Sequence, residues 1–171
     1  WDEKLEKYKN QTGPIRRGIG MSIFWYNTAV WPISLETSSC RMVLNQDGSI
    51  QLQIGETEIG QGSDTAFAQM ASETLGIKFD DVHVISTQDT DVTPFGTGSY
   101  ASRQTYVAGF SIRQTAELLK EKILKHANEL TRMPVYNLDI KDGNIVRTTD
   151  NKVLMTLGEL STEVLYSVTN C

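Results

Sequence analysis

Cysteine and histidine are scarce in this sequence of 171 residues. It contains two cysteines, Cys40 and Cys171, and two histidines, His83 and His126. Two cysteines are too few for a disulfide framework or a cysteine-based zinc site. We therefore expect two free thiols in a reducing compartment, and we assign the protein to the cytoplasm. The histidines lie far apart and form no H-x-x-x-H motif, so no metal pair is predicted.

Long apolar runs, basic clusters and common catalytic motifs are also missing. No apolar stretch approaches the roughly 18–20 residues that cross a bilayer, so no membrane partner is expected. The 21 acidic residues outnumber the 16 basic ones, which do not cluster, and this argues against nucleic acid as a partner. The signatures G-x-S-x-G, P-loop, H-E-x-x-H and C-x-x-C do not occur. The sequence therefore shows none of these common catalytic motifs.

The composition that remains is that of a folded domain. Hydrophobic residues make up 39% and charged residues 22%, which is enough apolar material for a core. The length is typical of one domain. Because the sequence starts at Trp1 and stops at Cys171, we expect a piece of a longer chain. Residues 1–171 would then form a single partial domain, and its former interfaces would make it self-associate.

The pattern of apolar residues predicts an α+β fold without an obvious linker. A mixed β-sheet is expected, with two main helices, 63–75 and 104–130, packed on it. Residues 17–31 are apolar on both faces, which predicts a strand covered on both sides. Two Asp-Gly turns predict hairpins. The remaining expected elements are a helix at 1–10, strands at 41–45, 49–54, 82–85, 138–140 and 144–147, and a helix from a capping box at 156 to about 165.

Two glycine-rich turns stand directly before the two main helices. The first is Gly60-Gln61-Gly62, and the second runs from Gly96 to Gln104. The N-terminus of a helix presents unpaired N–H groups and a partial positive charge, and glycine allows a ligand to approach the backbone. The pair therefore suits a ligand with phosphate and many hydrogen-bonding edges, and we expect both turns to meet at one pocket.

A purely structural explanation of the same turns stays open. Glycine before a helix often only makes a turn, and the nearby serines can act as caps. The polar side chains of Gln61 and Gln69 favour a functional reading, because they lie near helices whose other residues are typical of a core and would need hydrogen-bond partners there.

Several ordered motifs resemble the molybdenum-binding subunit of the xanthine dehydrogenase and aldehyde oxidase family. The similarity covers roughly residues 14–130. The motifs that carry it are 16–20, 55–65, 69–77, 81–84, 89–90 and 98–105. The resemblance implies an oxidoreductase that hydroxylates a purine-like heterocycle or an aldehyde with oxygen from water. It also implies a molybdenum–molybdopterin cofactor, which in bacteria often takes the cytosine dinucleotide form.

The resemblance also implies roles for particular residues. Gly60, Gln61 and Gly62 match the turn that contacts the pterin. Ala101, Ser102, Arg103 and Gln104 match the segment that binds the cofactor, with Ala101 next to the ligands of the metal. The family's general-base glutamate lies beyond this chain, so no catalytic residue is assigned, and Glu56 and Glu58 do not take its place. The chain would be inactive alone, and its partners would be the rest of the molybdenum subunit, iron–sulfur and FAD-carrying parts, and a small-molecule substrate.

Two other functions are compatible with the residues. One is a stand-alone, non-catalytic module that binds a phosphorylated ligand at the two helix N-termini. The other is a structural or assembly domain, which would be favoured if neither turn faced a cleft.

Overall fold

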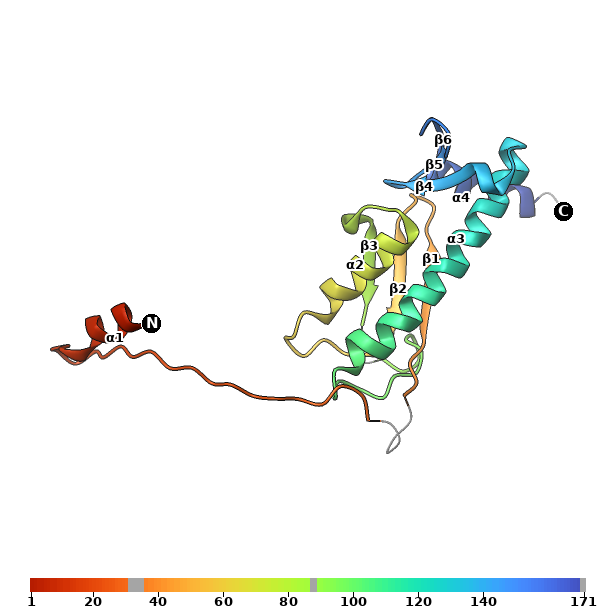
Figure 1. The fold of residues 1–171 in the computed structure, drawn as a ribbon. Coiled ribbons are helices and arrows are strands. Elements are labelled where there is room, and N and C mark those ends of the chain that lie inside the picture. Colours follow the sequence, from red (N-terminus) through yellow and green to blue (C-terminus); the bar gives the residue numbers. More distant parts are fainter. Residues whose placement is uncertain (31–35, 87–88, 170–171) are drawn as a thin grey trace.

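Two small sheets form the frame of the molecule (Figure 1). The computed structural model describes residues 1–30, 36–86 and 89–169. The first sheet has the order β1-β2-β3, with β1 antiparallel and β3 parallel to β2. The second has the order β4-β5-β6 and is antiparallel throughout. The strands are β1 (Cys40–Leu44), β2 (Ile50–Ile54), β3 (Val82–Ile85), β4 (Leu138–Lys141), β5 (Asn144–Arg147) and β6 (Val153–Thr156).

Two helices pack against each other and against the first sheet, which confirms the predicted α+β fold. Helix α2 (Ser63–Leu75) is the crossover between the parallel strands β2 and β3. Helix α3 (Gly109–Thr131) runs along the length of the body (Figure 1) and contacts α2, β1 and β4. A third helix, α4 (Leu157–Thr169), begins at the predicted capping box. There the Glu159 amide donates to Thr156 Oγ1 at 3.1 Å, and the Thr156 amide donates to Glu159 Oε2 at 2.7 Å.

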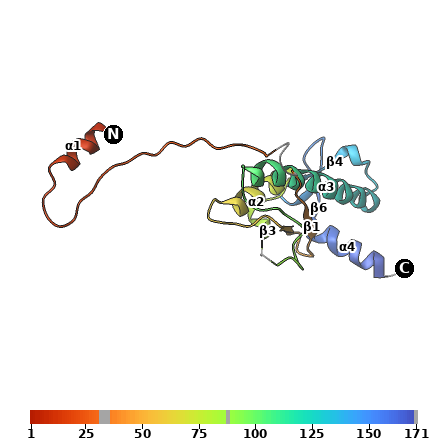
Figure 2. The ribbon, with the colours of Figure 1, turned by 90° about the horizontal axis from the view of Figure 1, so that it is seen from below.

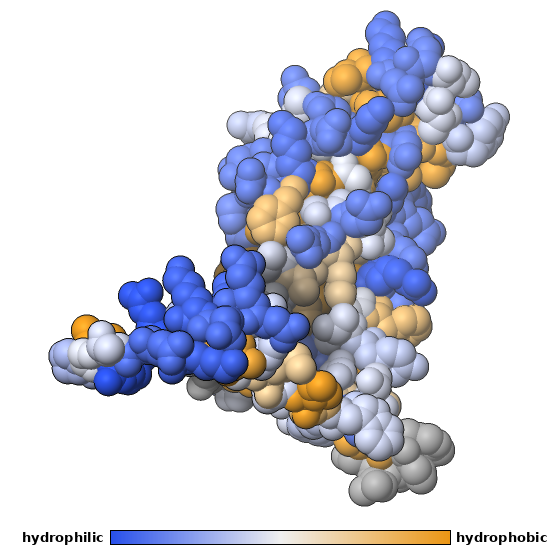
Figure 3. Space-filling model, turned by 60° about the vertical axis from the view of Figure 1, so that its left-hand side comes forward, coloured by the Kyte–Doolittle hydropathy of each residue, from blue (hydrophilic) through white to orange (hydrophobic). Residues whose placement is uncertain are grey.

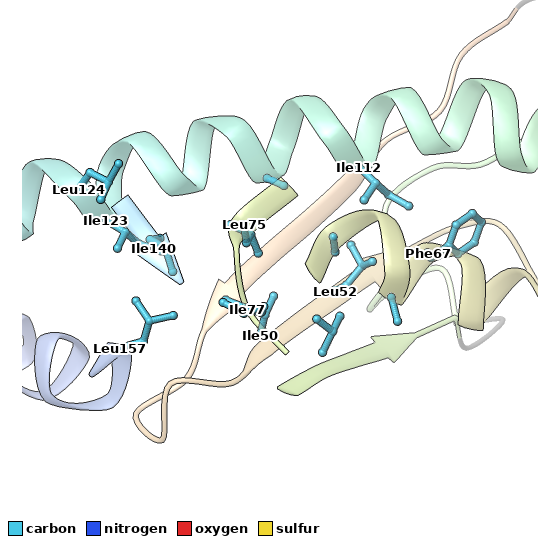
Figure 4. Close-up of a cluster of buried hydrophobic side chains, with 14 of the residues drawn as sticks. Ile50, Leu52, Phe67, Leu75, Ile77, Ile112, Ile123, Leu124, Ile140 and Leu157 are labelled. Carbon is cyan, nitrogen blue, oxygen red and sulfur yellow. The ribbon is translucent and has the colours of Figure 1, made fainter. Parts of the chain in front are cut away.

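The core is one continuous layer of apolar side chains that joins both sheets (Figure 4). Strand β2 contributes Ile50 and Leu52, which are fully buried, as are Phe67 of α2 and Ile112 of α3 (Figure 4). The layer continues through Leu75, Ile77, Ile123, Leu124, Ile140 and Leu157 toward the second sheet. Burial of such side chains contributes roughly 1.5–3 kcal/mol each.

The N-terminal segment, residues 1–30, lies mostly outside this body. Helix α1 (Asp2–Lys9) buries no residue, and the extended chain that follows it lies away from the body in both views until it reaches the body near Tyr26 (Figures 1 and 2). The strand predicted at 17–31 is therefore wrong for residues 17–30, which form no strand, and Trp31 lies outside the described residues. The physical reason is that no strand of the described chain lies beside this segment to accept its backbone hydrogen bonds.

The structure also describes one of the two cysteines and allows a search for membrane-spanning helices. Cys40 is a free, partly buried thiol that donates to Thr115 Oγ1 at 3.1 Å, and burial raises the pKa of this thiol. Cys171 lies outside the described residues. Across the residues that the structure covers, no helix combines the length and the apolar character that crossing a bilayer requires.

Candidate functional site

The two glycine-rich turns meet at one cavity, as the sequence predicts. The cavity measures about 390 Å³ and takes Gln61 from the first turn and Ser102, Arg103 and Gln104 from the second. Tyr26, from the N-terminal segment, completes the wall. Because α2 and α3 pack side by side, the chain segments that precede them are brought to the same end of the body.

A chain of amide hydrogen bonds crosses from one turn to the other. The Ile59 backbone N–H donates to Gln61 Oε1 at 2.7 Å, and Gln61 Nε2 donates to Gln104 Oε1. Gln104 Nε2 in turn donates to the Thr57 carbonyl at 2.8 Å. Gln104 is buried whereas Gln61 is exposed at the cavity. Each amide therefore has a fixed orientation, and Gln61 keeps one N–H and one lone pair for a ligand.

A carboxylate of the chain itself occupies the start of α2. Glu58 Oε1 accepts from the amides of Gly60 at 2.7 Å and Gly62 at 3.0 Å, and Oε2 accepts from the Asp64 amide at 3.1 Å and Ser63 Oγ at 3.1 Å. These hydrogen bonds, with that of Asp64 the largest contribution, lower the pKa of Glu58 to about 2. The donors that were expected to bind phosphate at this turn are thus already satisfied, which weakens the case for a phosphate-binding module at both helix starts.

A buried ion pair holds the second turn. Arg103 and Glu56 both have fully buried side chains, and their closest N–O distance is 2.5 Å. The same guanidinium donates to the carbonyls of Gly98, at 3.2 Å, and Thr37. Ser38 Oγ donates to the other oxygen of Glu56 at 3.0 Å. The Arg103 charge is therefore neutralised inside the protein, while Nε has no partner among the described residues.

The backbone at Gly55, which precedes the first turn, crosses the start of the second turn with no space for a side chain. A Cβ on Gly55 would lie 2.1 Å from the Pro94 carbonyl oxygen and 2.6 Å from the Gly96 nitrogen. A Cβ on Gly96 would lie 2.7 Å from Glu56 Oε2. Only glycine allows this approach, so these two residues fix how closely the two stretches of backbone lie to each other.

The loop that enters the second helix has a strained backbone. Ala101 and Ser102 have φ values of 48° and 57°, in the left-handed region, at a cost of about 1–3 kcal/mol each. The Ala101 N–H donates to the Tyr26 hydroxyl, and its carbonyl accepts from the Ala29 N–H, both at 2.8 Å. A π-helical turn, Gln104–Ala108, follows before α3. Strain and π-turns both concentrate at functional sites.

The cavity offers neutral hydrogen-bonding groups and no free charge. The hydroxyls of Ser99, Ser102 and Thr105 line it and have no partner within the part of the chain that the structure describes. Its one cationic lining residue, Arg103, is paired. Such a donor set matches a polar ring system with amide-like edges, whose donors and acceptors pair with carboxamides and hydroxyls.

The structure brings together most of the predicted site residues. Gln61, Ser102 and Gln104 face the cavity directly or line it. Gly60 and Gly62 flank Gln61 with positive φ and open space at the Cβ position. Ala101 is buried, with its backbone tied to the N-terminal segment. Gln69 is exposed on α2, so the expectation that its amide needs a buried partner is wrong.

Two residues escaped sequence reasoning. Glu56 is the buried partner of Arg103, and Tyr26 belongs to the segment predicted as a strand. Glu56 stands directly after Gly55, in the stretch that leads to the first turn, and this position does not mark it as buried.

Comparisons with known proteins match nearly the whole chain to one family. The molybdopterin cofactor-binding domain model matches residues 1–169. The xanthine dehydrogenase molybdenum-binding subunit of Escherichia coli O157:H7 is 46% identical over 167 residues, which make up 97% of this chain and 22% of that protein. The 6-hydroxypseudooxynicotine dehydrogenase complex subunit gamma of Paenarthrobacter nicotinovorans is 30% identical over 155 residues, covering 90% of this chain and 19% of that protein.

A solved structure also shares the fold. Quinoline 2-oxidoreductase from Pseudomonas putida 86 superimposes with a TM-score of 0.69 at 25% identity, over 78% of this chain and 17% of that one. This chain spans about a fifth of the length of the curated relatives described above.

Proposed function

Because the chain belongs to the molybdopterin cofactor-binding domain family, we propose that the cavity between the two glycine-rich turns holds a molybdenum–molybdopterin cofactor. The observation that carries the proposal is the amide chain Gln61–Gln104, which joins both turns across a cavity of about 390 Å³. A pterin presents donors and acceptors along its ring edges, and oriented carboxamides and free hydroxyls are the groups that pair with such edges.

Each predicted site residue has a distinct part in this proposal. Gly60 and Gly62 leave the backbone beside Gln61 accessible, because their Cβ positions face open space. Gln61 and Gln104 orient the ring, and Ser102 supplies a hydroxyl. Ala101 would lie beside the metal and takes up little volume there. Arg103 holds the second turn in place and offers no free charge to the cofactor, since Glu56 and two carbonyls occupy its guanidinium.

The whole protein is proposed to be an oxidoreductase that hydroxylates a purine-like heterocycle or an aldehyde with oxygen from water. When bound, the cofactor supplies the two-electron redox chemistry. The residues of this chain orient it and exclude water from its buried side. The relatives' names refer to xanthine, 6-hydroxypseudooxynicotine and quinoline, which supports a heterocycle. Iron–sulfur and FAD-carrying parts outside this chain would accept the electrons, and the cytosine dinucleotide form of the cofactor belongs to the same proposal.

The test is cofactor content in the complete enzyme. Gln61→Ala and Gln104→Ala remove the two amides, and we expect each to lower bound molybdenum and pterin at least tenfold, measured by metal analysis and by pterin fluorescence after gel filtration. Gln69→Ala is the matched control, because it removes the same side chain from the exposed side of α2 and should leave both contents unchanged. Full cofactor content in a Gln61→Ala/Gln104→Ala double variant would contradict the proposal.

A further inference from the structure

The N-terminal segment exposes an uncharged, apolar stretch. Residues 18–28 contain no charged side chain. Trp25 is 98% exposed and Ile23 86% exposed, and Met21 and Phe24 are similarly open to solvent. The face of the molecule that Figure 3 shows is mostly hydrophilic. An apolar, charge-free and extended stretch of this kind is unfavourable in water and prone to pair with other strands.

The order of residues in this stretch is that of a strand. Ile19, Met21, Ile23 and Trp25 alternate with Gly20, Ser22, Phe24 and Tyr26, so aromatic or aliphatic side chains stand on both faces. β-branched and aromatic residues dominate it, which favours extended pairing. A strand with apolar residues on both faces belongs inside a sheet that is covered on both sides.

Neither of the two sheets formed by residues 36–86 and 89–169 meets that requirement. The first sheet buries Ile50 and Leu52 on the helix side, but its other face carries Arg41, Gln51 and His83. Adding the segment to that sheet would leave one of its apolar faces in water. The strands of both sheets are also only four or five residues long, which is less than half of residues 18–28.

We propose that residues 18–27 form an interaction surface that enters, as a strand, a sheet contributed by the rest of the molybdenum subunit. The relatives provide the chain for such a sheet, because the matched region is only about a fifth of their length. The partner is defined by its chemistry: an open strand edge within a sheet whose two faces are both apolar and covered.

The same segment also contacts the cavity, so its pairing with the rest of the subunit would affect the cavity wall. Tyr26 and Ala29 hold both backbone groups of Ala101 at distances of 2.8 Å, and Tyr26 lines the cavity wall. Fixing residues 18–27 in a sheet therefore fixes the hydroxyl that supports the strained turn at Ala101. The pairing itself does not depend on which ligand the cavity binds.

Amide hydrogen exchange in the complete subunit tests this inference. Peptides that cover residues 18–27 should exchange at least 100-fold more slowly than an unstructured chain. Exchange within tenfold of the unstructured rate would overturn the proposal. Molybdenum content, measured on the same sample, is a separate readout. If residues 18–27 are protected but the metal is missing, only the proposed cofactor is contradicted. If these residues are unprotected but the metal content is full, only the proposed strand is contradicted.

Proline variants distinguish a central strand from an edge strand. Successive N–H groups of a strand point to opposite neighbours, so Ser22→Pro and Ile23→Pro should each lower the yield of assembled subunit at least tenfold. Ser22→Thr and Ile23→Val, which keep the N–H and favour a strand, should assemble normally. A dimer of this chain in which residues 18–27 of one copy crosslink to the other copy would identify a second copy as the partner and overturn the assignment.

Discussion

The two glycine-rich turns share a sequence design but are stabilised by opposite means. The turn at Gly60–Gly62 satisfies its own amides with an adjacent carboxylate, Glu58. The turn at Gly96–Gln104 contains two strained residues, and an arginine buried against Glu56 holds it in place. The first is therefore locally complete, whereas the second depends on residues far away in the chain.

This difference shows what a glycine-helix motif alone can establish. It marks places where the backbone is accessible, but it does not tell whether the amides are free. At the first turn a local glutamate uses them. At the second turn, contacts with the N-terminal segment support the strained backbone of Ala101. The cavity beside this turn offers a ligand hydroxyl groups and the Gln61–Gln104 carboxamide pair.

The largest effect is expected at the buried ion pair. Arg103→Ala leaves the Glu56 carboxylate buried without its partner, which should lower the free energy of unfolding by about 3–5 kcal/mol. Chemical denaturation measures this change. The second turn depends on the pair, so the loss should be much larger than for any single change at the first turn.

A double variant sharpens that prediction. Arg103→Met with Glu56→Leu replaces the pair by apolar side chains and should cost less than Arg103→Ala alone, because no charge stays buried. If the two variants lost equal stability, the ion pair would not be what holds the second turn.

The next largest loss of stability is expected at Gly55, where a side chain has no space, and a smaller loss at Gly60, where only the backbone conformation requires glycine. Gly55→Ala places a methyl group against the Pro94 carbonyl and should destabilise the protein by about 3 kcal/mol through overpacking. Gly60→Ala enters open space but must adopt a φ of 96°, which should cost about 1–2 kcal/mol. Thermal and urea unfolding compare them directly, and an equal cost at both positions would contradict the crossing of the backbones.

The smallest effect is expected on the pH dependence of stability, through Glu58 at the first turn. Folding lowers the pKa of Glu58 from its ordinary 4.5 to about 2. Its contribution to stability is therefore complete above about pH 4.5, falls as the pH is lowered, and is lost below about pH 2. The free energy of unfolding of Glu58→Gln, measured from pH 7 to pH 2, should fall less steeply than that of the parent protein.

A matched carboxylate checks this interpretation. Glu73→Gln removes an exposed carboxylate from α2, away from the helix start that Glu58 caps, and should flatten the acid dependence less than Glu58→Gln does. If it flattened the profile as much as Glu58→Gln does, the hydrogen bonds at the start of α2 would not be the cause.

Local chemistry explains which elements could be predicted. The helix expected at 63–75 forms with those bounds because Gly62 and Gly76, both with left-handed φ, bracket it. The Asp-Gly turns at 47–48 and 142–143 join antiparallel strands as expected. In these cases the information lies within a few neighbouring residues.

Long-range contacts explain what could not be predicted. Nothing near Glu56 marks it as buried, since its partner Arg103 lies 47 positions further on. The alternation of residues 17–31 indicates a strand, but a pattern cannot specify which chain supplies the neighbouring strand. The convergence of Gln61 and Gln104 was predictable because both positions precede helices that pack together.

The crossing at Gly55 and Gly96 has a consequence for which positions of this protein can change over evolutionary time. Since main chain touches main chain there, any substitution that adds a side chain at either position must push the two backbones apart. Residues that line the neighbouring cavity, such as Ser99 and Thr105, are outside this contact, so the chemistry of the cavity can change one side chain at a time while the crossing stays as it is.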